Sequence, residues 1–209
     1  MRGHIAFLSI FLGTQAVAAD RAGQFDYYVL ALTWSPNWCD IEGDARGAPQ
    51  CNGPDRYGWA LHGLWPQHER GWPANCATIK EPPRRSMTRN MTDIMGSAGL
   101  AWHQWKKHGT CTGLSGQEYF DLSRQAYDAI TRPNVFRKLE KEVKLTPSVV
   151  EAAFIRDNPA LKPDMITITC RDAYISEARI CLNKDLEPRT CGADVIKDCR
   201  RAGLFIPMQ

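Results

Sequence analysis

Short apolar runs separated by polar, turn-rich stretches give this chain the pattern of a mixed α and β protein. Residues 25–34 and 57–65 are rich in aromatic and β-branched side chains, which predicts two buried strands. Residues 165–170 and 174–182 alternate, which predicts two further strands. Residues 39–55 are rich in Gly, Pro, Asn and Asp, a composition typical of a loop.

Helical spacing of apolar positions predicts helices in the middle of the chain. Residues 116–129 and the more charged residues 135–145 show this spacing, and Ser148 resembles an N-cap for a helix over 149–156. Residues 86–95 are expected to form a short helix, whereas 66–83 form a long connection of the kind that often carries function. With no internal repeat or break in composition, the chain is expected to be one α+β domain.

The first 19 residues differ from the rest and predict a secretory signal peptide. Arg2 precedes an apolar stretch over 5–12, and residues 16–19 are small, as a cleavage site requires. The apolar stretch is too short to span a membrane. Residues 20–209 are therefore expected to be the mature domain, free of any membrane segment and located in the periplasm or outside the cell.

Charge and cysteine content narrow the class of protein. The net charge of +3 fits an anionic partner without requiring one. Eight cysteines, all after the signal, indicate an oxidising compartment and up to four disulfides. Their wide spacings include no C-x-x-C pair, which argues against zinc ligation. They are Cys39, Cys51, Cys76, Cys111, Cys170, Cys181, Cys191 and Cys199.

Residues 103–111 (His-Gln-Trp-Lys-Lys-His-Gly-Thr-Cys) concentrate the chemistry of the chain. As a helix, this segment would pack the indoles of Trp102 and Trp105 into the core and end at Gly109. A solvated basic helix face is the alternative interpretation. The polar side of the helix would consist of His103, Gln104, Lys107 and His108.

A second group of histidines strengthens the functional interpretation. His62 and His68 flank Trp65, so the mature chain has two histidine clusters. Two imidazoles can serve as base and acid in one site, because their ordinary pKa lies close to neutrality.

The two clusters resemble a known family. Residues 59–67 (Trp-Ala-Leu-His-Gly-Leu-Trp-Pro-Gln) and 103–111 resemble the two active-site segments of the RNase T2 family of secreted ribonucleases. Residues 32–36 and 174–181 also resemble that family, in the same order along the chain. The resemblance implies a central antiparallel sheet flanked by helices and stabilised by disulfides.

The resemblance also implies an activity. The chain would cleave RNA internally without metal or cofactor, through attack of a 2′-hydroxyl that leaves a 2′,3′-cyclic phosphate, and would not cleave DNA. By position, His108 would be the base and His62 the acid. Lys107 would stabilise charge on the phosphate, which His103 would contact. The protein is expected to be a monomer.

One position departs from the family, which has Glu where this chain has Gln104. An amide keeps the size and hydrogen bonding of the carboxylate but carries neither charge nor proton. Two interpretations remain: either Gln104 orients Lys107 or a phosphate oxygen adequately, or the protein is a weakened or inactive RNA-binding homologue.

Base recognition is expected to be weakly specific. By its place in the motif Trp65 would be a stacking platform, and stacking tolerates any base. A core indole is the alternative. Tyr57 and Gln67 are further candidates for substrate binding, but relatives vary at the position of Gln67, so no base preference transfers.

The resemblance also implies how the eight cysteines pair. The implied pairs are Cys39–Cys51, Cys76–Cys111, Cys170–Cys199 and Cys181–Cys191.

Two rival functions for the chain remain beside the ribonuclease. One is a metallohydrolase that uses His62, His103 and His108, and the other is a purely structural disulfide domain.

Overall fold

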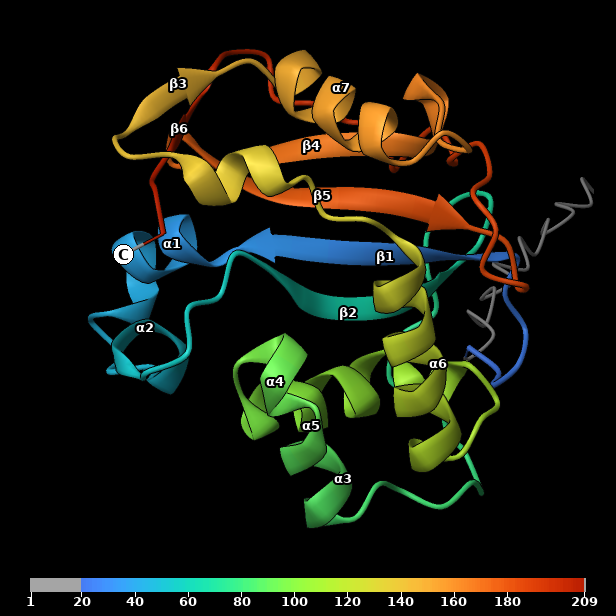
Figure 1. Ribbon diagram of the computed structural model, residues 1–209. Helices are drawn as coiled ribbons and strands as arrows, with labels where there is room; N and C mark the ends of the chain where they lie inside the picture. The colour runs from blue at the N-terminus through green and yellow to red at the C-terminus, as the bar shows by residue number, and fades with distance from the viewer. Residues whose placement is uncertain (1–19, 209) are drawn as a thin grey trace, which may run out of the picture.

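The computed structural model describes residues 20–208, so the signal peptide expected at residues 1–19 lies outside the described residues. A six-stranded sheet runs through this part of the chain (Figure 1). Antiparallel pairing joins β2 to β1, β1 to β5 and β5 to β4, while β3 and β6 form a small antiparallel pair beside β5. The strands are β1 (Tyr27–Trp34), β2 (Trp59–Gln67), β3 (Val143–Leu145), β4 (Ile166–Arg171), β5 (Tyr174–Leu182) and β6 (Gly203–Phe205).

Helices cover two regions of this sheet and complete the predicted α+β fold. In Figure 1, α3 to α6 gather beside β2, and α7 lies along β4. Where a loop was expected over residues 39–55, the chain forms a π-helical turn (Cys39–Gly43) and α2. The helices are α1 (Ser35–Trp38), α2 (Pro49–Asn52), α3 (Arg85–Asn90), α4 (Thr92–Met95), α5 (Ala98–Lys107), α6 (Gly116–Ala129) and α7 (Pro147–Asp157).

The four predicted strands are confirmed, each within two residues of its expected bounds, and the helix over 116–129 is confirmed as α6. The helix predicted over 135–145 is wrong. Asn134–Lys138 is a 3-10 turn, and the residues that follow enter the sheet as β3, where Val143 pairs with Phe205. Pairing with a strand distant in sequence overrides a local helical pattern. The last helix begins at Pro147, so Thr146 rather than the predicted Ser148 occupies the N-cap position.

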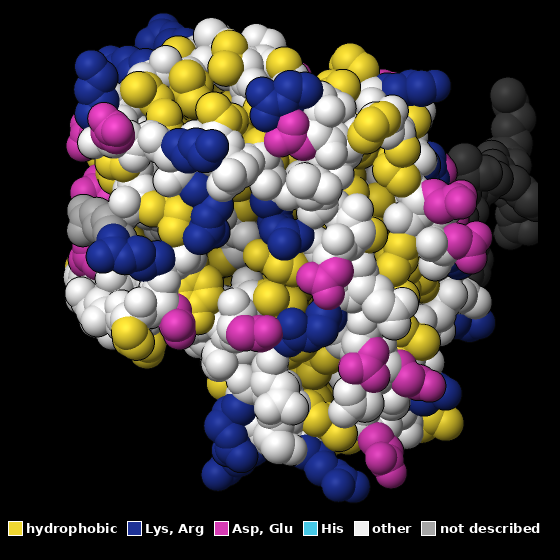
Figure 2. All heavy atoms as spheres, in the orientation of Figure 1, with side chains coloured by type: hydrophobic (Ala, Val, Ile, Leu, Met, Phe, Trp, Pro, Cys, Tyr) yellow, Lys and Arg dark blue, Asp and Glu magenta, His cyan; other side chains and the backbone are white. Residues whose placement is uncertain are grey.

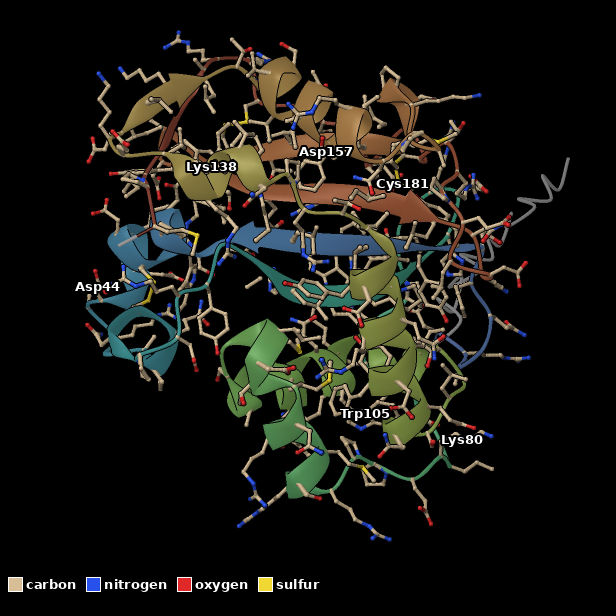
Figure 3. The ribbon with its side chains drawn as sticks, viewed as in Figure 1. Asp44, Lys80, Trp105, Lys138, Asp157 and Cys181 are labelled. Carbon is tan, nitrogen blue, oxygen red and sulfur yellow. A yellow bond between two sulfur atoms is a disulfide. The ribbon has the colours of Figure 1, made fainter. Side chains whose placement is uncertain are left out.

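The buried face of α5 differs from the predicted one. Trp105, which is labelled in Figure 3, is 2% exposed and packs against the ring of Tyr119 on α6. Trp102 is 40% exposed. The prediction that both indoles anchor the helix is therefore wrong for Trp102. The buried stripe instead follows the spacing i, i+3, i+4, i+7. It consists of Ala101, Gln104, Trp105 and His108.

Four disulfides tie the loops to this framework, with the same pairing that the family resemblance implied. Cys76–Cys111 joins the long loop after β2 to the 3-10 turn after α5 and so fixes the end of that helix. The bridges are Cys39–Cys51, Cys76–Cys111, Cys170–Cys199 and Cys181–Cys191.

No helix among residues 20–208 has the length and apolar character needed to cross a bilayer.

A pair of carboxyl groups lies where α7 meets the loop before β6. Glu151 is half-buried, and this burial, together with the charge and hydrogen bond of Asp198, raises its pKa to about 7. Asp198 accepts hydrogen bonds from the hydroxyl of Thr167 and the amide of Ile168. The protonated form of Glu151 therefore suits the fold better than the ionised form.

This pair predicts a pH-dependent stability. The stabilising contribution of protonated Glu151 is fully present below about pH 4.5 and is lost as pH rises through about 7. Glu151→Gln should raise the melting temperature at pH 8.5 by a few degrees more than at pH 4.5, an effect kept small by solvent screening. Thermal unfolding at both pH values measures it, with the exposed Glu140→Gln as control. An equal effect of Glu151→Gln at both pH values would contradict the account.

Candidate active site

A cavity of about 370 Å³ opens where β1, β2 and β5 face α5. Both histidine clusters of the sequence contribute to it, although more than 40 residues of chain separate His62 from His103. The residues that line it are Val29, His62, Trp65, Gln67, Trp72, His103, Gln104, Lys107, His108, Arg179, Asp194 and Val195. Figure 2 shows one face of the molecule, on which lysine and arginine side chains lie among apolar ones.

Two glycines allow α5 and the turn after it to approach the sheet and α6. A Cβ atom at Gly63 would overlap the amide oxygen of Gln104 and the indole nitrogen of Trp65. A Cβ at Gly109 would overlap the rings of Trp105 and Tyr119. The glycine that follows each histidine, His62 and His108, therefore provides close packing.

A β-bulge places His62. Leu61 pairs with Leu32 and Gly63 pairs with Ala31, so His62 is an extra residue between two successive pairs of the β1–β2 ladder. A bulge bends its strand and re-aims the side chain at that point. The imidazole of His62 is part-buried and lines the cavity.

The carboxylate of Glu177 on β5 contacts the His62 ring. Glu177 Oε1 lies 2.5 Å from His62 Nδ1, and its other oxygen lies 2.7 Å from Nη2 of Arg179. Burial alone would raise the pKa of Glu177, but the hydrogen bond from His62 and the charges of His62 and Arg179 outweigh burial and lower it. The carboxylate therefore stays ionised and can accept a hydrogen bond from Nδ1 of His62, which leaves Nε2 of the ring for another contact.

His108 has the opposite surroundings. It caps the C-terminus of α5 and is 5% exposed. Burial, with the positive charge of Lys107 next and those of His62 and His103 after it, lowers the pKa of His108 to about 3. The imidazole is therefore neutral at physiological pH and available to accept a proton. Burial and Lys107 also lower the pKa of His103.

Trp65 joins these groups. Its ring stacks on His108 with centroids 5.2 Å apart and meets His62 edge-on at the same centroid distance. Its indole nitrogen donates a 2.8 Å hydrogen bond to Gln104 Oε1, and the guanidinium carbon of Arg179 lies 5.3 Å from the ring centroid. Gln104 is thus a buried hydrogen-bond partner of the indole.

The cavity brings together most of the residues that the sequence singled out. The exceptions are His68, which does not line the cavity, and Tyr57. The hydroxyl of Tyr57 donates to the carbonyl of Thr92, and Tyr57 lines a separate cavity near α2. Gln67 lines the site, but its amide is buried and donates to the carbonyl of Pro66. The predicted site residues found here are His62, Trp65, Gln67, His103, Gln104, Lys107 and His108.

Glu177 and Arg179 are site residues that the sequence analysis missed. A signal was present, because both are charged and both stand at alternate positions on one face of a strand that is otherwise largely apolar. Such charges in a central strand require partners. Here Arg179 donates to Glu177, and Glu177 also contacts His62.

The cavity histidines do not form a metal-ligand cluster among the described residues. Cys39, Asp44 and Cys51 are the one group there whose ligand atoms lie within 4.8 Å of one another. Both of those cysteines are committed to a disulfide, so this group is not a metal site.

Comparison with known proteins gives one family. The model of the Ribonuclease T2 family matches residues 25–191. A ribonuclease of Aeromonas hydrophila is 39% identical over 116 residues, which are 56% of this chain and 51% of that protein. A probable ribonuclease of Haemophilus influenzae is 29% identical over 203 residues, 87% of this chain and 66% of that protein. The chain thus spans between half and two thirds of the length of these relatives.

Solved structures share the fold. RNase NT, whose structure is a complex with 5′-AMP, matches with a TM-score of 0.65 at 20% identity. The match covers 89% of this chain and 100% of that one.

Proposed function

Because the chain belongs to the ribonuclease T2 family, we propose that it is an endonuclease that cleaves single-stranded RNA without a metal ion. A 2′-hydroxyl of the RNA would attack the adjacent phosphorus and leave a 2′,3′-cyclic phosphate. The observation that carries this proposal is the pair His62 and His108, two imidazoles lining one cavity beside Lys107, one held by a carboxylate and the other buried and neutral.

Each histidine suits one half of the reaction. Neutral His108 removes the proton of the 2′-hydroxyl while the O2′–P bond forms. The P–O5′ bond breaks as His62 gives its Nε2 proton to the leaving oxygen. Lys107 and His103 stabilise the negative charge that grows on the phosphoryl oxygens. DNA lacks the nucleophile and is not cleaved.

Trp65 supports weak base specificity. Its indole lines the cavity beside both histidines, and a base can stack on such a surface whatever its identity. The nucleotide bound by RNase NT supports nucleotide binding by this fold. Gln67 lies at the cavity wall and is a further candidate for a contact to the base, through the hydrogen-bonding capacity of its amide that the bond to Pro66 leaves over.

The same proposal extends to the location and state of the protein. Residues 20–209 are the mature domain, a monomer in the periplasm or outside the cell, and residues 1–19 are a signal peptide that is removed. Four disulfides support this location because such bonds persist in oxidising compartments.

Incubation with RNA tests the proposal. In the presence of EDTA, the protein should cleave RNA and produce 2′,3′-cyclic phosphate ends, detected by mass spectrometry of the fragments. His62→Ala and His108→Ala should each lower the rate by about 100- to 10,000-fold, the usual contribution of an acid or base. His68→Ala is the control, since His68 lies outside the cavity lining. Loss of cleavage with EDTA would favour the metallohydrolase, and a fully active His62 or His108 variant would remove that residue from the mechanism.

The amide at position 104 raises the alternative that the protein binds RNA without cleaving it. Gln104 Oε1 already accepts a hydrogen bond from the indole nitrogen of Trp65, and a carboxylate at this position would accept the same hydrogen bond. Gln104→Glu should therefore change the rate by about tenfold or less, as expected of an auxiliary group. A new negative charge should also raise the pKa of His108 and move the acidic limb of the pH–rate profile upward.

Steady-state rates of the wild type and Gln104→Glu from pH 3 to pH 8 measure both effects. A wild-type protein that binds RNA but does not cleave it, together with a strongly active Glu variant, would establish the alternative function.

A further inference from the structure

The carboxylate of Glu177 divides its two oxygens between two partners. Oε1 lies 2.5 Å from Nδ1 of His62, and Oε2 accepts from Nε of Arg179 at 2.8 Å. Glu177 itself is 6% exposed. A buried carboxylate is stable only when it is paired and hydrogen-bonded, and here both requirements are met by residues of the cavity.

The backbone of Glu177 is paired on both sides. It lies in β5, opposite Thr33 of β1 on one side and Thr169 of β4 on the other, next to a shift in the register of the β4–β5 ladder. His62 is the extra residue of a bulge in β2, where the ladder with β1 is interrupted. The carboxylate of Glu177 gives the His62 ring a contact from a strand other than its own.

We propose that Glu177 is the positioning residue of His62, with Arg179 as the counter-charge that keeps its second oxygen bound. This inference rests on the proposed function, in which His62 is the acid. Glu177 holds the proton on Nδ1, so that Nε2 carries the proton that moves to O5′ when the P–O5′ bond breaks. The Nδ1 proton stays on the imidazole throughout, and Glu177 is never protonated in the cycle.

The leaving group tests this role. A dinucleoside phosphate releases an alkoxide that needs a proton, whereas a nucleoside 3′-(4-nitrophenyl phosphate) releases nitrophenolate, which does not. Glu177→Gln should lower kcat on the dinucleoside phosphate about 10- to 100-fold, a part of the usual acid contribution. On the nitrophenyl ester the loss should stay within about threefold, since attack by the 2′-hydroxyl uses His108 and not His62.

Glu187→Gln is the matched control, because it removes the same charge at an exposed position beyond β5. Equal losses on both substrates, or no loss on either, would overturn the positioning role. A wild type that cleaves neither substrate would instead overturn the proposed function, a result distinct from the first two.

Nitrogen-15 NMR of the wild type provides a readout that needs no variant. The neutral His62 ring should be the Nδ1–H tautomer, with its proton shifted downfield by the carboxylate. The tautomer of the wild type can be measured even if the Glu177→Gln variant does not fold. A neutral His62 that carries its proton on Nε2 would contradict the inference.

Discussion

The packing of the Trp65 indole between two histidines is the interaction on which the geometry of the site depends. One face of the ring stacks on His108, which belongs to the end of α5, and the ring meets His62 of its own strand edge-on. The hydrogen bond from the indole nitrogen of Trp65 to Gln104 is a second link between β2 and α5. An aromatic ring contributes area and direction together, so this one residue sets the distance between sheet and helix and therefore between the two imidazoles.

The chemistry of each histidine follows from how the fold places it. His108 is neutral because α5 turns it inward, as the fourth member of a stripe that contains Gln104 and Trp105. His62 remains open to the cavity because a bulge re-aims it. Two residues of the same type thus have different surroundings: His108 is buried and neutral, whereas His62 is part-buried beside the carboxylate of Glu177. An acid–base pair can use such a difference.

Local patterns were sufficient for the main elements and for the two motif segments. The alternation in residues 174–182 and the helical spacing in residues 116–129 each gave an element with the predicted bounds. These segments bury their apolar faces in the way their own pattern specifies, so tertiary structure does not override them. The two histidine segments were found for a different reason, the resemblance of nine consecutive residues in each to one family.

What escaped prediction depends on contacts between distant parts of the chain. The bulge at His62 arises from a register shift against β1, and strand β3 forms because its residues pair with β6, as Val143 does with Phe205. The inward rotation of α5 buries Gln104 and exposes Trp102, the reverse of what polarity alone indicates. Glu177 was missed because its partner, His62, lies 115 residues away along the chain.

In the proposed reaction His108 removes the proton of a 2′-hydroxyl and His62 gives a proton to the leaving O5′, so every cut requires a 2′-hydroxyl. An RNA oligonucleotide that carries a single 2′-deoxynucleotide tests this requirement when every cut is mapped by mass spectrometry. The bond on the 3′ side of the deoxynucleotide should stay intact, while the bonds around it are cut and end in cyclic phosphates. Cleavage at that bond at a rate equal to its neighbours would contradict the proposed reaction, because its only nucleophile would be absent there.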